Sequence, residues 1–400
     1  MKYVPVQAVS VFLWGKRVGV LAYAYDQYSR FEYDPDFRRS GLEIAPIVMP
    51  LSRAMYVADE FELPRRSQFF GLPGVFADSL PDSFGQRLIG KWMEARGIDV
   101  SSVTPLDRLS YVGSRGMGAL TYEPEARADR LPVSALDMRR LVEESRLALN
   151  ADLSKMDADD ALREIIRVGT SAGGAQAKAV VGWRRTDGSF LAGDAGLPAD
   201  YEHWIVKFSP KDDSNAGQRE YDMYLKAKAA GVEMSECRLF ELDGVRHFMT
   251  RRFDRDGERR FHVQTLAALQ HLPPGGPRSL YSYDVLFDTA EALGLGYEAR
   301  EQLFRRMAFN VCSNEIDDHT KNFSFMMKED GVWRLAPAYD LTGFHFADGD
   351  AAYDRWENQH ALSVNGKFSG ITDEDVLAVG EKYAIGTAPK VLAEVHQVFV

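Results

Sequence analysis

The densest group of reactive residue types lies in CSNEIDDHTKNFSFMM (residues 312–327), where polar side chains come directly before an apolar, strand-like run. Asp317 and Asn322 are five residues apart, and Asp340, in LAPAYDLTG, follows 18 residues after Asn322. Phosphoryl transfer needs a carboxylate that orients the attacking hydroxyl, and oxygen ligands that hold Mg²⁺ on the phosphates. An Asp, an Asn five residues later and a second Asp beyond them form the set that protein kinases use. A solvated polar turn is the alternative for the segment taken alone.

A metal-dependent hydrolase is a weaker interpretation of the same carboxylates. His319 has no second histidine four residues later, and the sequence contains no HExxH motif. We therefore expect His319 to be structural or to support the neighbouring carboxylates, with direct chemistry as the alternative.

Lys207, in HWIVKFSP, is a lysine inside an apolar, strand-like pattern. Because unpaired burial of an ammonium group is costly, its head must reach water or an anion. A lysine on the α- and β-phosphates of a nucleotide satisfies this condition, and Glu220, on a predicted helix 13 residues later, could hold it there. The alternatives are a lysine that reaches solvent from an edge strand and a glutamate on a solvated helix face.

GTSAGGAQAKAVV (residues 169–181) is a glycine-rich segment that contains Ser171. Its glycines have the G-x-x-x-x-G spacing of a P-loop, but Ala175 stands where that motif needs lysine, and a strand pattern follows instead of a helix. The backbone N–H groups of Gly173 and Gly174 could still hold phosphates, because glycine permits close approach and positive φ. Ser171 would then lie beside the γ-phosphate. A plain β-turn with an incidental serine is the alternative.

MTRRFDR (residues 249–255) connects the β-rich and helical parts of the sequence. Backbone groups of such a segment can bind an adenine edge, with Phe253 packed nearby and Asp254 within reach of a ribose. A salt-bridged surface turn is the alternative. A second glycine cluster, GSRGMGAL (residues 113–120), is followed by TYEP and not by a helix, so we predict a structural turn there.

The elements that must position these residues change in character along the chain. Residues 4–34 resemble a β-meander around a WGKR turn, and strand and hairpin patterns return between 178 and 254. From about residue 261 onward the pattern is largely helical, with short strands at NFSFMM and VWRLAP. A polar, proline-bearing stretch at 123–134 is typical of a boundary between modules.

Composition narrows the possible classes of protein. A chain of 400 residues with 45% hydrophobic content predicts a globular protein of two or three domains. The net charge of −11, without a basic block, disfavours a direct nucleic-acid surface but leaves room for a locally basic pocket. Two cysteines without CxxC spacing disfavour a disulfide framework or a thiolate metal site. Without a run of ~18 apolar residues, no membrane span is expected, and we predict a cytoplasmic protein.

Taken together, TSAGGAQAK, WIVKF, RRFDR, DDHTKNFSF and PAYDL, in that order, make the sequence resemble the HipA family, the serine/threonine kinase toxins of bacterial HipBA toxin–antitoxin pairs. WGKRVGVL and LPDSFGQRL also look like the family's first subdomain, so the resemblance covers nearly the whole chain. It implies an α+β, two-lobed protein-kinase-like fold with an N-terminal β-containing subdomain and a mostly helical C-terminal lobe. We predict three parts, namely residues 1–128, the ATP-binding part at 129–255 and the helical part at 256–400.

The resemblance also implies roles for individual residues. Ser171 matches the serine that the family autophosphorylates, which silences the kinase. Lys207 matches the lysine on the ATP phosphates, and Asp317 matches the catalytic aspartate. Asn322 and Asp340 match the Mg²⁺ ligands.

The remaining predicted ATP contacts surround these residues. Arg251 and Phe253 match backbone positions that bind adenine. The full set of predicted nucleotide contacts besides Lys207 is Gly173, Gly174, Ala175, Arg251, Phe253, Asp254 and Lys321, with Glu220 and His319 in support. Two residues depart from the family pattern. Arg251 stands where an acidic or neutral residue is expected, and Asp318, where glycine is common, adds charge that could affect substrate choice.

The resemblance further implies a partner and a target. A small helix-turn-helix antitoxin of the HipB type would bind operator DNA, which this chain would meet only through that antitoxin. The protein substrate would be an aminoacyl-tRNA synthetase, with glutamyl-tRNA synthetase as the best guess. The rival hypotheses are a small-molecule kinase with the same Mg-ATP site and a non-catalytic module that binds the antitoxin.

Overall fold

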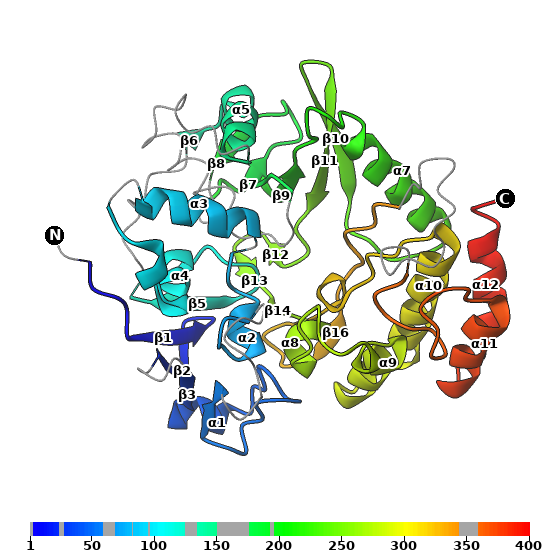
Figure 1. The fold of residues 1–400 in the computed structure, drawn as a ribbon, viewed down its shortest axis with the longest axis horizontal. Helices are drawn as coiled ribbons and strands as arrows, with labels where there is room; N and C mark the ends of the chain where they lie inside the picture. Colours follow the sequence, from blue (N-terminus) through cyan, green and yellow to red (C-terminus); the bar gives the residue numbers. More distant parts are fainter. Residues whose placement is uncertain are drawn as a thin grey trace. The chain divides into compact units, whose positions relative to one another are not determined.

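The computed structural model describes residues 3–23, 28–58, 69–81, 83–94, 97–124, 134–149, 176–192, 196–343 and 359–400 (Figure 1). Its internal contacts divide the chain into two compact units. Unit 1 comprises Met1–Ile44, Met49–Gln218 and Glu236–His262, and unit 2 comprises Ala45–Val48, Arg219–Ser235 and Val263–Val400. The predicted division at residues 128 and 255 stays a prediction.

The first sheet of unit 1 is antiparallel, with strand order β4-β3-β2-β1-β5. Trp14 and Gly15 both have positive φ, 50° and 74°, and form the tight turn between β1 and β2. This confirms the strand–turn–strand predicted at WGKR. The strands are β1 (Ala8–Leu13), β2 (Lys16–Tyr23), β3 (Ser29–Tyr33), β4 (Met55–Val57) and β5 (Leu120–Glu123).

Short helices accompany this sheet in unit 1. Helix α3 (Ser83–Glu94) lies in the stretch that contains LPDSFGQRL, and Gly97 follows it in a left-handed conformation with φ 70°. A Pro at the start and a full capping box between Thr104 and Asp107 fix the beginning of α4. The remaining helices are α1 (Pro35–Ser40), α2 (Gly74–Ala77), η2 (Val100–Ser102), α4 (Pro105–Val112) and α5 (Met138–Leu149).

The second sheet of unit 1 has strand order β10-β11-β9-β7-β8-β6. Trp204, Val206 and Met249 from its central strands belong to one hydrophobic cluster together with Leu141 of α5. A small two-stranded ribbon, β12 (Arg255–Asp256) with β13 (Arg259–Arg260), follows it. The sheet consists of β6 (Ser134–Ala135), β7 (Lys178–Trp183), β8 (Phe190–Ala192), β9 (Glu202–Lys207), β10 (Cys237–Leu242) and β11 (Val245–Arg251).

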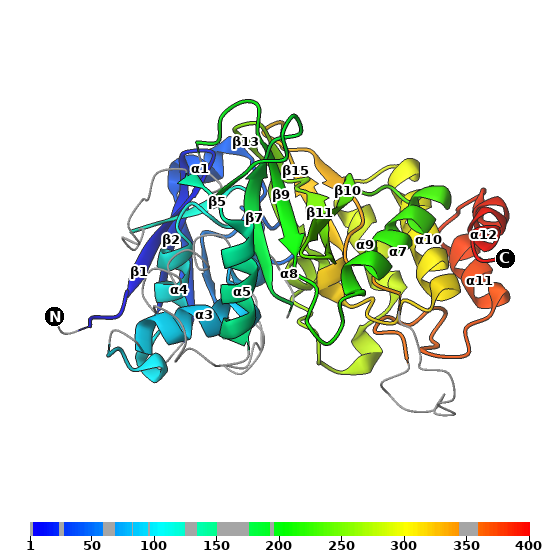
Figure 2. The same cartoon turned by 90° about the horizontal axis from the view of Figure 1, so that it is seen from above.

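Unit 2 is largely helical, as the sequence predicted from residue 261 onward. Helix α10 contacts α9, α11 and α12, and both ribbon views show it between α9 and the C-terminal pair (Figures 1 and 2). The helices are α7 (Ala216–Ala229, which starts in unit 1), α8 (Leu266–Gln270), η4 (Arg278–Leu280), α9 (Tyr283–Ala292), α10 (Tyr297–Ser313), η5 (Thr320–Asn322), α11 (Asp373–Lys382) and α12 (Ala388–His396).

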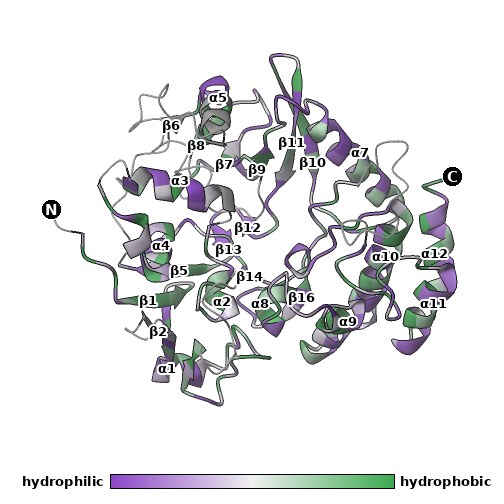
Figure 3. Cartoon of the chain, in the orientation of Figure 1, coloured by the Kyte–Doolittle hydropathy of each residue, from purple (hydrophilic) through white to green (hydrophobic). Residues whose placement is uncertain are grey.

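Amphipathic spacing explains how the outer helices pack. The buried residues of α12 are Ala388, Val391, Leu392 and Val395, which recur at the spacing of one helix face. Figure 3 shows hydrophobic and hydrophilic residues together along this helix. A small sheet of order β14-β15-β16 completes the fold, built from β14 (His262–Thr265), β15 (Ser324–Met327) and β16 (Trp333–Leu335). Among the described residues, no helix is long and apolar enough to cross a membrane.

Candidate active site

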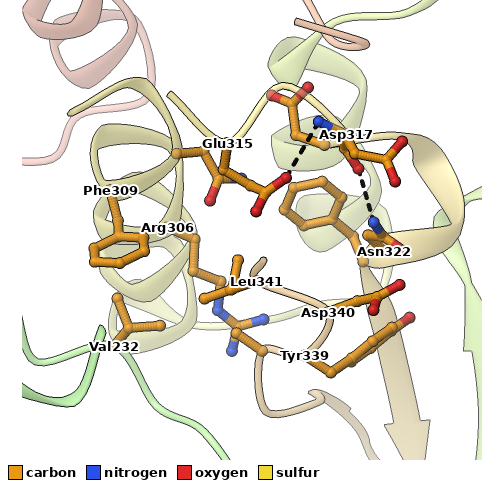
Figure 4. A pocket seen from close by; sticks show the side chains of 13 residues that line it. Val232, Arg306, Phe309, Glu315, Asp317, Asn322, Tyr339, Asp340 and Leu341 are labelled. Carbon is orange, nitrogen blue, oxygen red and sulfur yellow. Dashed lines mark hydrogen bonds between the residues drawn. The ribbon is translucent and has the colours of Figure 1, made fainter. Parts of the chain in front are cut away.

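A small pocket in unit 2 brings together the three residues whose spacing suggested phosphoryl transfer. Asp317, Asn322 and Asp340 all line it, although 23 residues of chain separate the two aspartates. Figure 4 shows their side chains at one side of the pocket, with Arg306 and Phe309 of α10 at the other. The rest of the lining consists of Val232, Asn310, Glu315, Asp318, Phe323, Ala338, Tyr339 and Leu341.

The end of α10 determines where the turn that carries Asp317 begins. Asn314 caps the helix in a left-handed conformation, and its N–H donates to the carbonyl oxygens of Asn310 and Val311. Asparagine is one of the few residues besides glycine that adopt this conformation readily. Residues 315–318 therefore leave a buried helix in a fixed direction.

Asn322 reaches back to Asp317 across the short η5 turn. Its Nδ2 donates to the backbone carbonyl of Asp317 at 2.7 Å, and its own N–H donates to the carbonyl of His319 at 2.8 Å. Because the amide nitrogen is bound to Asp317, Oδ1 of Asn322 is the atom with which this side chain can bind a cation. The Asp317 carboxylate is 64% exposed, so it remains accessible to a substrate.

Asp340 lies in an unusual backbone conformation next to these residues. Its φ is +58°, in the left-handed region that non-glycine residues adopt rarely, although aspartate does so more often than most. The preceding residues hold it there. Ala338 N–H donates to the carbonyl of Glu233 at 2.8 Å, and the Tyr339 hydroxyl donates to the carbonyl of Lys321 at 2.7 Å. The segment that carries Asp340 is thus tied directly to the turn that carries Asn322.

The surroundings of Asp317 in the pocket raise its pKa. Desolvation contributes most, and the carboxylates of Asp340 and Asp318 raise this pKa further. His319, with Nε2 3.8 Å from Oδ1 of Asp317, acts in the opposite direction. The predicted supporting position of His319 therefore matches its contact. The mutual repulsion of these carboxylates means that a bound cation would stabilise the group.

The donor set fits Mg²⁺. Two carboxylates and an amide are hard oxygen ligands, and Mg²⁺ typically uses one or two carboxylates together with substrate phosphates and water. Among the described residues, no group of three or more His, Cys, Asp or Glu could hold a metal ion.

Unit 1 contains two buried lysines that face each other. Lys207 of β9 is directly opposite Lys178 of β7 in the antiparallel register, and the two residues are only 9% and 2% exposed. Residues opposite each other point to the same face of a sheet, where like charges destabilise it. Nζ of Lys207 also lies 5.7 Å from the centre of the Phe248 ring.

The alternatives for Lys207 and Glu220 are wrong. β9 lies between β11 and β7, so Lys207 is not on an edge strand. Glu220 is 5% exposed, so it is not an ordinary solvated helix residue. The two belong to different units, and their pairing stays a prediction.

Asp254 does not have the surroundings predicted for it. Its side chain is fully buried and accepts hydrogen bonds from Arg252 (Nε, 2.9 Å; Nη2, 2.8 Å), Arg255 (Nη1, 2.6 Å) and the N–H of Gly118 (2.7 Å). A carboxylate enclosed by two guanidinium groups has no exposed oxygen for a ribose. The predicted ribose contact is therefore wrong for this conformation, and Asp254 is a structural residue of unit 1.

The adenine contacts predicted for the neighbouring residues stay predictions. Arg251 is exposed at the end of β11, and its N–H donates to the carbonyl of Glu236 at 2.8 Å. An adenine contact there must consequently use a carbonyl oxygen as acceptor. Phe253 is half-buried in the turn that follows β11.

The second glycine cluster, at 113–120, is a structural turn, as predicted. Arg255 donates to the carbonyl oxygens of Gly116 and Gly118, both at 2.9 Å, and Arg260 donates to that of Gly118 at 3.1 Å. Its carbonyl oxygens bind guanidinium groups, which is the opposite of the N–H array that holds a phosphate.

Comparison with known proteins agrees with this arrangement. Residues 9–123 match the HipA N-terminal domain, and residues 170–399 match the HipA-like C-terminal domain. The chain belongs to the HipA family. The HipA of Shewanella oneidensis MR-1, solved with HipB and its operator DNA, aligns over 98% of this chain and 91% of its own, with a TM-score of 0.63 and 15% identity. The predicted α+β, HipA-like fold class is confirmed.

A curated relative is more similar in sequence over a shorter stretch. "Putative kinase Y4dM" of Sinorhizobium fredii (strain NBRC 101917 / NGR234) is 26% identical over 152 residues, which are 34% of this chain and 36% of the relative. The chain therefore matches about a third of the length of that relative, in contrast to the nearly complete alignment with the solved HipA.

Part of the predicted HipA-type site lies outside the described residues. Ser171, Gly173, Gly174 and Ala175 all belong to 150–175, so their predicted roles in phosphate binding and autophosphorylation stay predictions. The same is true of Lys321 as an ATP contact. Lys321 is described, in η5, and its carbonyl accepts the hydrogen bond from Tyr339.

Sequence reasoning missed several residues of this site. Lys178 had a usable signal, a lysine at the start of a predicted strand directly after the glycine-rich segment. Glu315 had none, since a glutamate just beyond a helix resembles any solvated residue. Asp318 was noted, and its side chain is completely buried and bonded within unit 2, whereas its effect on substrate choice stays a prediction.

Proposed function

We propose that this HipA-family chain is an Mg-ATP-dependent serine/threonine protein kinase and the toxin of a toxin–antitoxin pair. The observation that carries the proposal is the meeting of Asp317, Asn322 and Asp340 in one pocket, although Asp340 follows 18 residues after Asn322. An exposed carboxylate with a raised pKa, beside an amide and a second carboxylate, is what transfer to a hydroxyl requires.

In this proposal Asp317 accepts a hydrogen bond from the acceptor hydroxyl and orients it. Its raised pKa moves the carboxylate towards the operating pH, which makes it a better proton acceptor than an ordinary aspartate. Asn322, through Oδ1, and Asp340 would hold Mg²⁺. When bound, the ion neutralises charge on the phosphates and aligns them.

The lysine pair of unit 1 would supply the cationic side of the nucleotide site. Lys178 and Lys207 are buried on one face of the sheet, and two ammonium groups in register are a suitable cationic contact for an ATP phosphate. Lys178 belongs to the strand that follows the glycine-rich segment in the sequence, and the backbone N–H groups of Gly173 and Gly174 would be further phosphate contacts.

Regulation and partners are the finer part of the proposal. Ser171 would be autophosphorylated and silence the enzyme. The substrate would be an aminoacyl-tRNA synthetase, first of all glutamyl-tRNA synthetase. The solved HipA with HipB and operator DNA supports a HipB-like helix-turn-helix antitoxin as partner, with DNA bound through that antitoxin.

The test is incubation of the purified chain with Mg-ATP labelled at the γ-phosphate, with and without candidate synthetases, followed by mapping of phosphorylated residues. We expect label on Ser171 and on a synthetase. Asp317→Ala should remove both, and Ser171→Ala should remove only the self-label. Label on a small molecule alone would favour the small-molecule kinase, and nucleotide binding without any transfer would favour the non-catalytic module.

A further inference from the structure

Two buried carboxylates flank the exposed carboxylate of Asp317. Glu315 is 1% exposed and Asp318 is 1% exposed, whereas the Asp317 side chain is 64% exposed. Three acidic residues within four positions thus have two kinds of surroundings. Of the three, only Asp317 is accessible to a substrate. Buried carboxylates persist only where they are fully hydrogen-bonded, so Glu315 and Asp318 must bind groups inside the protein.

Glu315 connects the catalytic turn with the residues that follow Asp340. One oxygen, Oε1, accepts the N–H of Asp317 at 3.2 Å (Figure 4). The other, Oε2, accepts the N–H of Thr342 at 2.6 Å and that of Gly343 at 2.8 Å. A single side chain therefore fixes the backbone of Asp317 against the chain just beyond the second aspartate.

Asp318 makes the corresponding connection on the other side of Asp317. Its Oδ2 accepts from the Tyr283 hydroxyl at 2.8 Å and binds Nδ1 of His360 at 2.9 Å. Its Oδ1 accepts the N–H of Ala361 at 2.7 Å and that of Leu362 at 3.4 Å. The carboxylate uses both oxygens, two contacts each, and leaves none for a ligand.

The two connections have a common consequence for the path of the chain. Glu315 binds the backbone at Thr342–Gly343, and Asp318 binds the chain at His360–Leu362. Both points are thereby fixed to the backbone on either side of Asp317. We propose that Glu315 and Asp318 are positioning residues for phosphoryl transfer, which orient Asp317 by binding the chain at these two points.

This inference rests on the proposed kinase function and refines it. Asp317 presents its carboxylate from an irregular turn without a helix or strand to hold it. General-base and orienting groups lose most of their effect when displaced by about 1 Å. The two flanking carboxylates supply the rigidity that the turn itself lacks.

The atoms that each carboxylate uses allow a selective test. In Glu315→Gln, the single carbonyl oxygen can still accept from Thr342 and Gly343, but the amide NH₂ then faces the N–H of Asp317. In Asp318→Asn, the oxygen can keep Ala361, and the NH₂ can donate to the Tyr283 hydroxyl or to His360 in its other tautomer. The first variant therefore breaks the contact with Asp317, whereas the second can keep the contact with Ala361 and one with Tyr283 or His360 without the charge.

We expect kcat to fall about 10-fold to 100-fold in Glu315→Gln and Asp318→Ala, with KM for ATP within twofold of wild type, whereas Asp318→Asn keeps nearly full kcat. Hydrogen exchange on the full chain should show faster exchange at residues 342–343 in Glu315→Ala and at 361–362 in Asp318→Ala. Asp330→Asn, on the surface of unit 2, serves as the control.

Three results would overturn the proposal. The first is an equal loss in Asp318→Asn and Asp318→Ala, since the charge would then matter and not the connection. The second is a change of KM without a change of kcat. The third is unchanged exchange at both points. If the wild-type chain transfers no phosphate, the proposed function fails, while the exchange experiment still decides whether these carboxylates hold the chain.

Discussion

Unit 1 and unit 2 each contain an aspartate in a highly charged sequence, and they use it in opposite ways. In RRFDR, the carboxylate of Asp254 is fully buried, and the guanidinium groups of Arg252 and Arg255 neutralise it. In DDHTKN, the carboxylate of Asp317 is exposed, and desolvation together with the neighbouring carboxylates raises its pKa. The carboxylate of Asp254 is fully paired with buried guanidinium groups, whereas the carboxylates around Asp317 leave an excess of negative charge at an accessible pocket.

This difference shows what separates a structural charge from a reactive one. Both sequences have an aspartate within four residues of a basic residue, and both could be interpreted as surface turns or as nucleotide contacts. What distinguishes them is the sign of the surrounding charge and the access of solvent. We therefore expect changes at Asp254 to alter stability and changes at Asp317 to alter activity.

The largest expected effect is on activity. Asp317→Asn should lower the rate of phosphate transfer by about 10²-fold to 10⁴-fold, because the amide cannot accept a proton from the acceptor hydroxyl. The measurement is initial transfer rate with labelled Mg-ATP, together with urea unfolding to check that the fold is intact. A variant that unfolds more easily but keeps its specific activity would contradict the contrast with Asp254.

The next effect is on stability. Asp254→Asn should lower the free energy of unfolding by about 3–5 kcal/mol, because it leaves two buried guanidinium groups without their carboxylate. Urea unfolding measures this. The exposed Asp330–Arg334 pair provides the matched control, since Asp330→Asn removes a carboxylate from an arginine in solvent. Equal behaviour of the two variants would show that the network around Asp254 adds nothing.

A titration in unit 1 gives the third prediction. His262 is buried, Nε2 donates to the carbonyl of Ile44, and desolvation lowers its pKa to about 4. As the pH falls below 6.5, His262 of the unfolded chain binds a proton, whereas that of the folded chain does so only near pH 4. The stability of the folded chain that depends on neutral His262 is therefore complete above pH 6.5 and is lost as the pH falls to 4. Its size is about 3 kcal/mol. The stability difference between pH 7 and pH 4 should shrink by this amount in His262→Gln, and an unchanged difference would argue against the burial.

The smallest effect concerns the cation. Mg²⁺ should stabilise the wild-type chain by about 1.4 kcal/mol at ten times its Kd, because binding relieves repulsion between Asp317 and Asp340. Asp340→Asn should lose most of this gain, whereas Asp254→Asn should keep it relative to its own lower baseline. Thermal unfolding with and without MgCl₂ measures both. Stabilisation that persists in Asp340→Asn would place the ion elsewhere.

The sequence predicted those features that depend on local patterns. Hairpin turns such as Trp14–Gly15, the helix at α3 and the change to a helical C-terminal part follow from periodicity and from turn chemistry. The catalytic candidates were also predictable, since an Asp and an Asn five residues apart on one turn must lie close together. Asp340 was assigned to the same site only because it follows Asp317 and Asn322 in the sequence.

The features that failed depend on contacts between distant segments. No local pattern reveals that Asp254 binds Gly118, because that contact spans 136 residues. For the same reason, local patterns do not reveal the pairing of Lys178 with Lys207, which depends on strand register. They do not reveal the burial of Glu315 and Asp318 either. Burial of a charged residue is decided by its partners, and the partners come from elsewhere in the sequence.

The backbone of Asp340 limits which substitutions evolution could accept at this position. With φ at +58°, asparagine and glycine are tolerated by the main chain but lack a carboxylate. Glutamate keeps the carboxylate but has no comparable preference for this conformation, and β-branched residues are disfavoured there. Chemistry and geometry therefore select different sets of residues, and aspartate is the one that belongs to both. A saturation library at residue 340 should accordingly retain a single functional side chain, and this intolerance would identify the position without reference to any relative.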